Sequence, residues 1–247
     1  MPRAVSSCRW FAVRCCSSCS ASKMADADKI MNIWRTADAV TFDVDSTVIT
    51  EEGIDELAKF CGSGEQIAKL TQLAMQGDMI TFQDSLSTRL AIINPSLSQV
   101  KEFLNTHRPK LTNGIKELVS TLQAHGKEVF LVSGGFHCLI APVAAQLDIP
   151  PENVYANRLK FYFTGEYAGF DETQPTCKSG GKGKVIKHLK SERRFKTIVH
   201  VGDGSTDLEA SPPADAFIGF GGNVTRETVK SQAKLFITNF DDLRKSL

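Results

Sequence analysis

The chain has 247 residues, with 29 Lys and Arg against 28 Asp and Glu, so its formal net charge at pH 7 is +1. Apolar residues make up 42% of the chain, which is typical of a folded globular protein and excludes disordered, collagen-like and coiled-coil chains. No apolar run approaches the roughly 18 residues that a membrane helix needs, and a general nucleic-acid binder would usually be strongly basic. We therefore expect neither a membrane nor a nucleic acid as a partner.

The first 25 residues differ in composition from the rest of the chain. They are rich in Ser, hold four of the seven cysteines, contain no acid and carry four basic residues: Arg3, Arg9, Arg14 and Lys23. This composition is typical of an organelle transit peptide, and the alternative is a disordered extension with Met24 as the working start. The other three cysteines are too few for a disulfide framework. We expect a reduced, cytoplasmic protein, or a mitochondrial one if residues 1–24 act as a transit peptide.

The pattern begins with a strand and continues with helices. Residues 39–45 form a β-branched and aromatic run that ends in acids, which predicts a buried strand. Between residues 53 and 108, apolar residues recur at helical spacing in four groups, which glycines and Pro95 separate. Because no strand lies between these groups, the four helices are predicted to form a small unit inserted after the first strand.

After Pro109 the pattern alternates between helix and strand, which indicates a doubly wound parallel sheet of the α/β class. A hairpin is predicted around Thr164-Gly165. The predicted elements are helices at 115–122, 136–147 and 182–190, strands at 128–132, 197–201, 216–220 and 235–238, and the hairpin at 157–170. The chain is thereby divided into an extension (1–25), a first core part (26–52), the helical unit (53–110) and a second core part (111–247).

Polar residues that could carry chemistry follow the central strands of this predicted sheet. The clusters are Asp43 with Asp45, Ser133-Gly134-Gly135, Asp203 with Asp207, and Lys182 at the start of a helix. Because the carboxyl ends of parallel strands meet at one edge, these clusters are expected to converge. Asp43 and Asp45 are two residues apart and would point to the same side of a strand. Lys182 alone cannot offset four carboxylates, so a divalent cation with oxygen ligands, usually Mg²⁺, is predicted.

The residue types at this edge fit phosphoryl transfer. The amides and hydroxyl of Ser133-Gly134-Gly135 can hold an anion at a helix N-terminus. Asp43 is predicted to be the nucleophile, which would form an aspartyl-phosphate. Asp45 would protonate the leaving alkoxide and then deprotonate the attacking water. For Asp207 three roles stay open: it orients Lys182, it orients a metal-bound water, or it only caps a helix.

These motifs resemble those of the haloacid dehalogenase superfamily. Asp43-Val44-Asp45-Ser46-Thr47 is similar to its D-x-D-x-[TV] signature, and Ser133, Lys182 and the Gly-Asp-Gly run with Asp207 follow in the order of its other motifs. Longer stretches within about residues 30–240 resemble the phosphoserine phosphatase family: FDVDSTVITEEGIDELA, LVSGGF, ANRLKFYFTGEYAGFDETQPT, SGGKGKVI, VGDGSTD and PPADAFIGFGGNV. The resemblance implies a Rossmann-like core with a four-helix cap, Mg²⁺ as cofactor, and hydrolysis of O-phospho-L-serine to L-serine, the last step of serine biosynthesis.

The resemblance also implies roles for residues that their chemistry alone would not single out. Glu52 matches the partner of the substrate ammonium group, and Arg89 in the cap matches the residue that grips the substrate carboxylate, a task that suits a planar guanidinium. Met75 and Phe82 match residues that line the pocket, and Thr206 matches a residue near the site, with helix capping as an equal alternative. The implied metal ligands are the side chains of Asp43 and Asp203 and the carbonyl oxygen of Asp45.

Two positions depart from the family pattern. The cap carries Met75-Gln76-Gly77 where the family commonly has Met-Gly-Gly, with one apparent extra residue before Phe82, which bears on substrate access and affinity. His137 stands where Arg is common. Two other functions stay open: a phosphatase for another small phosphomonoester, against which Glu52 and Arg89 argue, and a phosphoryl-accepting, receiver-like module. The sequence does not fix the oligomeric state, and a homodimer is compatible with it.

Overall fold

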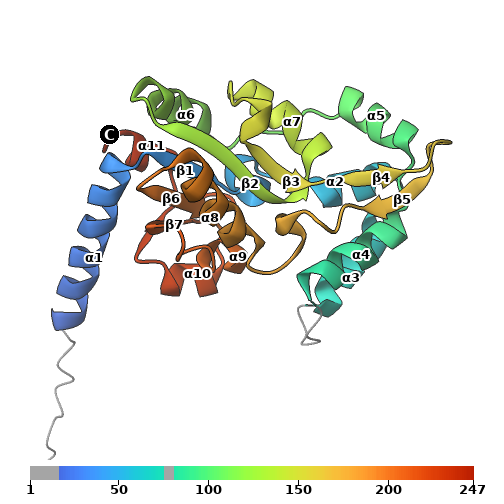
Figure 1. Ribbon diagram of the computed structural model, residues 1–247. Helices are drawn as coiled ribbons and strands as arrows, with labels where there is room; N and C mark the ends of the chain where they lie inside the picture. Colours follow the sequence, from blue (N-terminus) through green and yellow to red (C-terminus); the bar gives the residue numbers. More distant parts are fainter. Residues whose placement is uncertain (1–16, 75–80) are drawn as a thin grey trace, which may run out of the picture.

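A six-stranded parallel sheet lies at the centre of the structure, a computed structural model that describes residues 17–74 and 81–247 (Figure 1). The strands run in the order β3, β2, β1, β6, β7, β8, and every neighbouring pair is parallel. The order reverses beside β1, where a crevice for ligands is expected at the carboxyl ends. The strands are β1 (Ala39–Phe42), β2 (Glu128–Phe136), β3 (Val154–Asn157), β6 (Ile198–Gly202), β7 (Ala216–Phe220) and β8 (Leu235–Ile237).

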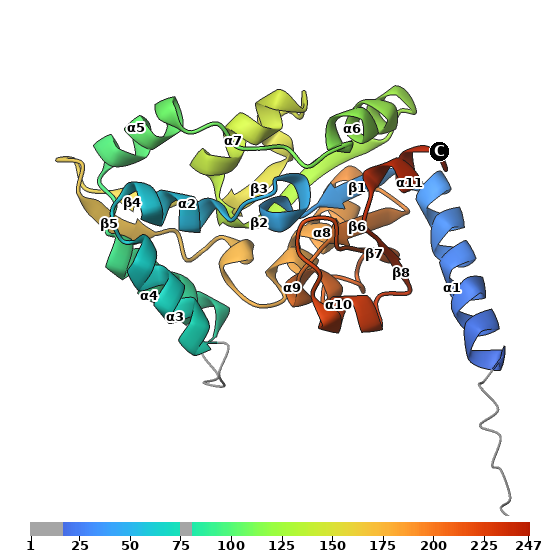
Figure 2. The ribbon, with the colours of Figure 1, turned by 180° about the vertical axis from the view of Figure 1, so that it is seen from behind.

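Helices cover both faces of the sheet, which explains why its strands are apolar on both sides (Figure 2). Helices α6, α7 and α11 pack on one face, and α8 packs on the other. In the described ranges, no helix is long and apolar enough to cross a bilayer. The helices that follow the first part of the core are α6 (Ile115–Ala124), α7 (His137–Gln146), α8 (Gly181–Arg193), α9 (Ser205–Leu208), α10 (Glu227–Gln232) and α11 (Phe240–Arg244).

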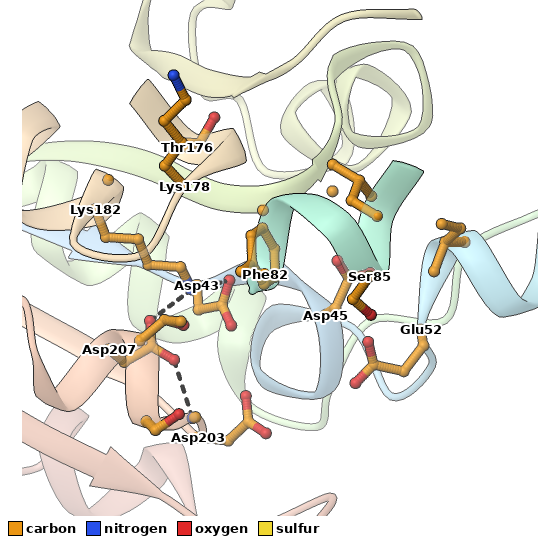
Figure 3. A pocket seen from close by; sticks show the side chains of 18 of the residues that line it. Asp43, Asp45, Glu52, Phe82, Ser85, Thr176, Lys178, Lys182, Asp203 and Asp207 are labelled. Atoms are coloured by element: carbon orange, nitrogen blue, oxygen red, sulfur yellow. Dashed lines mark hydrogen bonds and ion pairs between the residues drawn. The ribbon is translucent and has the colours of Figure 1, made fainter. Parts of the chain in front are cut away.

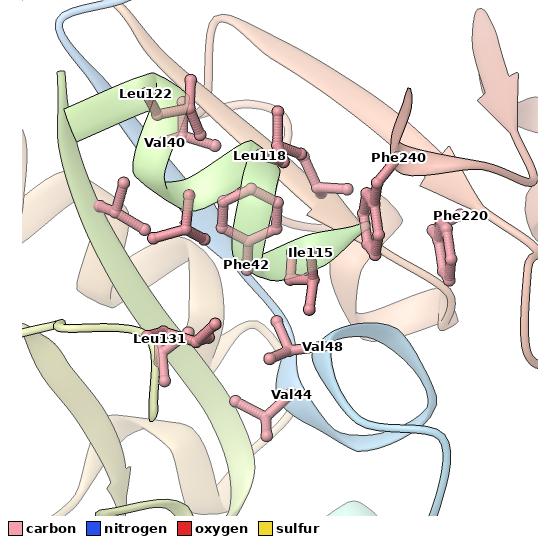
Figure 4. Packing of buried hydrophobic residues seen from close by; sticks show 14 of the residues in the cluster. Val40, Phe42, Val44, Val48, Ile115, Leu118, Leu122, Leu131, Phe220 and Phe240 are labelled. Carbon is pink, nitrogen blue, oxygen red and sulfur yellow. The ribbon is translucent and has the colours of Figure 1, made fainter. Parts of the chain in front are cut away.

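An apolar cluster between the sheet, α6 and α11 holds the strand that carries the candidate site (Figure 4). Phe42 is the last residue of β1, it is fully buried, and it meets the ring of Phe240 edge-on at 6.2 Å between centroids. Phe240 in turn stacks on Phe220 at 4.2 Å. Burial of each such side chain stabilises the fold by about 1.5–3 kcal/mol. The packing therefore fixes β1 immediately before Asp43.

Four helices between β1 and α6 form a second apolar cluster at the end of the sheet opposite the first helix of the chain (Figures 1 and 2). Phe136 and Leu139 of the core pack into this cluster, together with the hairpin β4 (Leu159–Phe161) and β5 (Tyr167–Phe170). Thr81 caps one helix and a Ser96–Gln99 capping box begins another. The four helices are α2 (Gly53–Phe60), α3 (Gly64–Ala74), α4 (Phe82–Ile93) and α5 (Leu97–Thr106).

The predicted fold class is confirmed, but two predicted strands have different bounds in the structure and one strand was not predicted. The strand predicted at 39–45 ends at Phe42, because the chain turns after Asp43. The strand predicted at 128–132 continues to Phe136, with a register shift against β3 beyond Val132. Strand β3 itself was not predicted, because it has only four residues and stands directly before the hairpin pattern, from which its apolar residues are not distinguishable.

The first helix, α1 (Ser17–Thr36), begins inside the segment that the sequence analysis assigned to an N-terminal extension. Its last turns belong to the core: Trp34 is fully buried, and its indole N–H donates to a backbone carbonyl of α11 at 3.2 Å. Lys127 Nζ donates to the carbonyl oxygens of Arg35 and Ala37, at 2.8 Å each. These carbonyl groups at the C-terminal end of the helix therefore have a hydrogen-bond donor. The helix therefore ties the beginning of the core to the end of the chain.

Replacing Trp34 tests this tie. We expect Trp34→Ala to lower the free energy of unfolding by about 3–5 kcal/mol, because a large buried side chain and a hydrogen bond are lost. Trp34→Phe is expected to cost less, since a ring remains in the cavity. Urea unfolding measures both, with Met24→Ala as the control, because Met24 is 70% exposed on the same helix. A loss below about 1 kcal/mol in Trp34→Ala would show that α1 is not part of the core.

Candidate active site

The carboxyl ends of β1, β2 and β6 face one pocket of about 300 Å³ (Figure 3). The first turn of α8 lines it from the core, and α2 and α4 line it from the inserted helices. Ser133 is not among the lining residues; it is fully buried, and its hydroxyl contacts Asp45 Oδ2. The predicted site residues that do line the pocket are Asp43, Asp45, Glu52, Phe82, Arg89, Gly134, Gly135, Lys182, Asp203, Thr206 and Asp207.

The chain turns sharply directly after Asp43 and Asp45. Asp43 still has extended backbone, and Ser46 then adopts a left-handed conformation with φ +56°, which turns the chain sharply. The expectation that Asp43 and Asp45 belong to a strand is wrong, because β1 ends at Phe42, but both side chains line the same pocket. The Asn223 side-chain amide donates to the carbonyl oxygens of Ser46 and Ile49, at 3.1 and 3.2 Å. These bonds offset the cost of the left-handed residue, which is on the order of 1 kcal/mol.

Asp45 lies in this turn with its carboxyl group facing the pocket from the side of α2 (Figure 3). Its Oδ1 accepts a hydrogen bond from the Gly53 amide at 2.8 Å, and its Oδ2 accepts one from the Ser133 hydroxyl at 3.5 Å. Burial, and then the nearby charge of Glu52, raise the pKa of Asp45 to about 7, although the Gly53 hydrogen bond opposes the rise. A carboxyl group of this kind can hold or release a proton near neutral pH, as a general acid and base must.

Lys182 joins two carboxylates at the bottom of the pocket. Its Nζ lies 2.7 Å from Asp43 Oδ1 and 2.6 Å from Asp207 Oδ1, and all three side chains are buried (Figure 3). Burial and the Asp207 charge raise the pKa of Asp43 well above its ordinary value, while Lys182 partly lowers it. Burial alone would lower the pKa of Lys182, but Asp207 and Asp43 raise it, so the ammonium group stays charged.

Three buried carboxylates converge closely enough to hold a metal ion. Oxygen atoms of Asp43, Asp203 and Asp207 all lie within 4.8 Å of one another. Asp203 accepts from the Thr47 hydroxyl at 3.0 Å and from Arg226 Nε at 2.8 Å. Negative charge still exceeds positive charge here, which fits a divalent cation with oxygen ligands. The Asp45 carboxylate is not in the cluster, and its carbonyl oxygen stays a predicted ligand.

The two glycines after Ser133 allow close approaches that no side chain would permit. A Cβ on Gly134 would lie 2.6 Å from Phe82 Cζ, and one on Gly135 would lie 2.8 Å from Asp45 Oδ2. The Gly135 amide donates to Ser133 Oγ at 2.9 Å. The segment therefore stays as bare backbone between the turn after β1 and the inserted helices, where amides can face an anion.

The residues predicted from the inserted helices lie on the far side of the pocket. Phe82, at the start of α4, covers Gly134, and Arg89 on the same helix lies with its guanidinium 3.9 Å from Asp55 Oδ1. Glu52 precedes α2, and its Oε1 accepts from the Ser46 hydroxyl at 2.8 Å. Burial raises the pKa of Glu52, which the Ser46 hydrogen bond opposes. Predicted residues Met75, Gln76 and Gly77 lie outside the described residues.

The sequence analysis missed Arg226, which lines the pocket from the residue before α10. Besides its bond to Asp203, its guanidinium lies 3.5 Å from Glu52 Oε1, so it connects the metal-site side of the pocket with the start of the inserted helices. The available signal was the polar run that follows the strand 216–220, since the analysis considered the ends of only three strands. Thr47 could also have been predicted as a site residue, because it belongs to the motif that contains Asp43 and Asp45.

Comparisons with known proteins agree with this geometry. A family model described as haloacid dehalogenase-like hydrolase matches residues 37–215. The phosphoserine phosphatase of Bos taurus is 59% identical over 224 residues, which cover 91% of this chain and 99% of that protein. The phosphoserine phosphatase of Homo sapiens is 57% identical over 220 residues, which cover 89% of this chain and 97% of that protein.

The folds agree as well. A solved structure of a substrate-bound phosphoserine phosphatase complex superposes with a TM-score of 0.73 at 25% identity, and the match covers 85% of this chain and 98% of that one. All the predicted site residues, from Asp43 to Asp207, lie within the span of the family model. The chain belongs to the haloacid dehalogenase-like hydrolases and, among them, to the family of the phosphoserine phosphatases.

Proposed function

We propose that this protein is a Mg²⁺-dependent phosphoserine phosphatase, which hydrolyses O-phospho-L-serine to L-serine and phosphate. The observation that carries the proposal is that one pocket brings Asp43, Asp45 and Lys182 together with Glu52 and Arg89. The first three fit phosphoryl transfer, and the last two offer one negative and one positive group for a zwitterion. The names and high identity of the relatives in Bos taurus and Homo sapiens support the same substrate.

The proposed reaction proceeds in two steps on Asp43 and Asp45. A carboxylate oxygen of Asp43 attacks phosphorus, the bond from phosphorus to the serine oxygen breaks, and an aspartyl-phosphate forms. Asp45 gives its proton to the departing serine oxygen, which suits a carboxyl group whose pKa is raised to about 7. Asp45 then takes a proton from a water that attacks the same phosphorus, which releases phosphate and restores Asp43.

The charges around Asp43 would stabilise the transferring group. Lys182, 2.7 Å from the nucleophile, is placed to face the phosphoryl oxygens, and Ser133 can add a hydroxyl donor. The side chains of Asp43 and Asp203 and the carbonyl of Asp45 would hold Mg²⁺, which supplies charge neutralisation when bound. Contacts of Asp207 with Lys182 support a role in orienting Lys182.

Substrate recognition is assigned to residues on the cap side of the pocket, within the proposed cap domain 53–110 and just before it. We assign the substrate ammonium group to Glu52 and the substrate carboxylate to Arg89, whose planar guanidinium matches a carboxylate. Phe82 would cover the substrate, and Thr206 would line its phosphate end. The product is L-serine, and we place the reaction at the last step of L-serine biosynthesis.

We propose the cytoplasm as the compartment, with the mitochondrion as the alternative if residues 1–24 direct the chain there. Support for a reducing compartment comes from Cys61, Cys138 and Cys177, all free thiols in the part of the chain that the structure describes.

Asp43→Asn tests the nucleophile. We expect kcat for phosphate release from L-phosphoserine to fall at least about 10³-fold, because the amide cannot form the covalent intermediate. Removal of divalent cations with a chelator is expected to abolish release in the wild-type chain, and added Mg²⁺ to restore it. Circular dichroism of the variant serves as the control for folding. Full activity of the variant would refute the mechanism. A long-lived phosphorylated Asp43 in the wild-type chain, without turnover, would favour a receiver-like module.

Arg89→Ala and Glu52→Gln test substrate recognition against each other. We expect Arg89→Ala to raise KM for L-phosphoserine about 10–100-fold, the effect of losing a hydrogen-bonded charge pair, and to change KM for O-phosphoethanolamine little, because that ester has no carboxylate. Glu52→Gln is expected to raise KM for both esters, since both carry the ammonium group, and to spare O-phospholactate. Equal effects of Arg89→Ala on phosphoserine and phosphoethanolamine would remove Arg89 from carboxylate recognition.

Asp45→Asn tests the raised pKa through stability. The folded protein keeps a proton on Asp45 up to about pH 7, whereas the unfolded chain loses it near pH 4, so this group lowers the free energy of unfolding as the pH rises between these values. Asn does not titrate. We expect the free energy of unfolding of metal-free Asp45→Asn, relative to that of the metal-free wild type, to rise by about 2 kcal/mol as the pH is raised from 5 to 8. Urea unfolding at each pH measures this difference.

The control for this measurement is Glu227→Gln, because the Glu227 side chain is 79% exposed. That variant is expected to follow the wild-type pH dependence. If Asp45→Asn also runs parallel to wild type over this range, Asp45 titrates at an ordinary pKa and its proposed role as an acid near neutral pH is contradicted.

A further inference from the structure

A continuous line of buried polar side chains runs behind the nucleophile. The Thr41 hydroxyl lies 2.7 Å from His200 Nδ1, and His200 Nε2 lies 2.8 Å from Asp207 Oδ1. The same Asp207 oxygen lies 2.6 Å from Lys182 Nζ, which reaches Asp43 Oδ1 at 2.7 Å. Thr41, His200 and Asp207 are completely inaccessible to solvent. The reaction proposed above uses Asp43 and Lys182 and leaves His200 without a role.

The sheet itself brings the beginning of this line together. Thr41 of β1 and His200 of β6 are direct partners in the parallel register, so their side chains lie side by side on the same face. That face is otherwise apolar and packs against α8, and Phe217 is the neighbour of His200 on β7, with ring centroids 6.3 Å apart. A buried imidazole costs free energy unless both of its ring nitrogens have partners. Here Thr41 and Asp207 are those partners.

The chemistry of Asp207 assigns the direction of its hydrogen bond with His200. Both oxygens of Asp207 accept from groups that can only donate: Oδ1 accepts from the Lys182 ammonium group at 2.6 Å and Oδ2 accepts from the Gly204 amide. The group is therefore a carboxylate, which only accepts, so His200 Nε2 carries the proton and donates. The other ring nitrogen, Nδ1, faces the Thr41 hydroxyl, which also lies 3.4 Å from the Val199 carbonyl oxygen. Gly204 N donates to the other oxygen, Asp207 Oδ2, at 2.9 Å.

We propose that His200 is a positioning residue, which holds Asp207 by the Nε2–H hydrogen bond so that Lys182 stays available to Asp43 and to the transferring phosphoryl group. The inference rests on the proposed phosphatase function and adds a residue to it. Asp207 Oδ1 accepts from His200 and from Lys182 at once. The hydrogen bond from the imidazole weakens the attraction of this oxygen for the Lys182 ammonium group. Without this donor, the oxygen has Lys182 as its one remaining partner among the contacts described, and the ammonium group is drawn away from Asp43.

A matched pair of substitutions separates the hydrogen bond from packing. His200→Leu fills the site without a donor, whereas the side-chain amide of His200→Gln can place an N–H where Nε2 is. We expect inorganic phosphate, titrated by calorimetry in the presence of Mg²⁺, to bind His200→Leu about tenfold more weakly than wild type, and kcat for L-phosphoserine to fall by a similar factor. His200→Gln is expected to recover most of both losses. Urea unfolding of both variants measures the change in packing.

Thr41 provides a second, independent pair. Thr41→Val keeps the shape and removes the hydroxyl partner of Nδ1, and Thr41→Ser keeps the hydroxyl. We expect the His200 Nε2–H proton to be seen in ¹⁵N-edited NMR as a slowly exchanging signal in the wild-type chain and in Thr41→Ser, and to exchange faster in Thr41→Val. Absence of this proton in the wild-type chain would overturn the assignment of the hydrogen bond.

The outcomes separate this inference from the proposed function. A loss of phosphate binding in His200→Leu that His200→Gln restores supports the positioning role, and unchanged binding in His200→Leu overturns it. Equal losses in both variants also overturn it, because they indicate packing alone. Phosphate release by the wild-type chain tests the substrate by itself: a chain that binds phosphate, and binds it more weakly in His200→Leu, but leaves phosphoserine intact would refute the substrate and still support the role of His200.

Discussion

The site depends on one buried ammonium group that is shared between two buried carboxylates. Lys182 Nζ lies within 2.7 Å of both Asp43 and Asp207, although desolvation costs several kcal/mol for each such ion. Such a group is tolerated only where its two partners are held in place, and they come from different parts of the chain, the end of β1 and α9. The parallel register of β1 and β6 and the helices on both faces supply that rigidity. The apolar core is in this sense the support for a charge arrangement that could not exist on a flexible loop.

In the proposed function, chemistry and recognition are carried by different parts of the molecule. Asp43, Lys182 and Asp203 are fixed at the end of the sheet, where the phosphoryl group would lie, and nothing in their arrangement distinguishes one phosphate ester from another. Arg89 lies on α4 of the inserted helices and Glu52 lies directly before the first of them. Selection among esters therefore depends on how the inserted unit sits on the core, and substitutions in that unit should alter the choice of substrate more than the chemical step.

Sequence patterns predicted the parallel sheet and most of the site because both leave periodic or clustered signals. Apolar runs that end in Asp or Gly marked the strands, and a parallel sheet forces such ends together. The turn at Ser46 left no signal, because a left-handed Ser is set by tertiary contacts such as those of Asn223 and not by local propensity. Arg226 is remote from the acids in sequence and meets Asp203 only after folding. Helix α1 was obscured because its first residues share the composition of the acid-free leader.

The way in which the inserted helices join the core separates the two residues that are proposed to recognise the substrate. Both crossing segments are held at the core, since Ile49 pairs with Leu111 and the Thr50 amide donates to the Lys110 carbonyl at 3.0 Å. Glu52 follows this fixed stretch directly, and Ser46 binds its carboxylate. Arg89 and Phe82 lie on α4, beyond the joint, and Phe82 closes on Gly134 with no room for a side chain between them. In the proposed function, Glu52 would therefore bind the ammonium group from a position fixed on the core, whereas Arg89 would bind the carboxylate from the inserted helices.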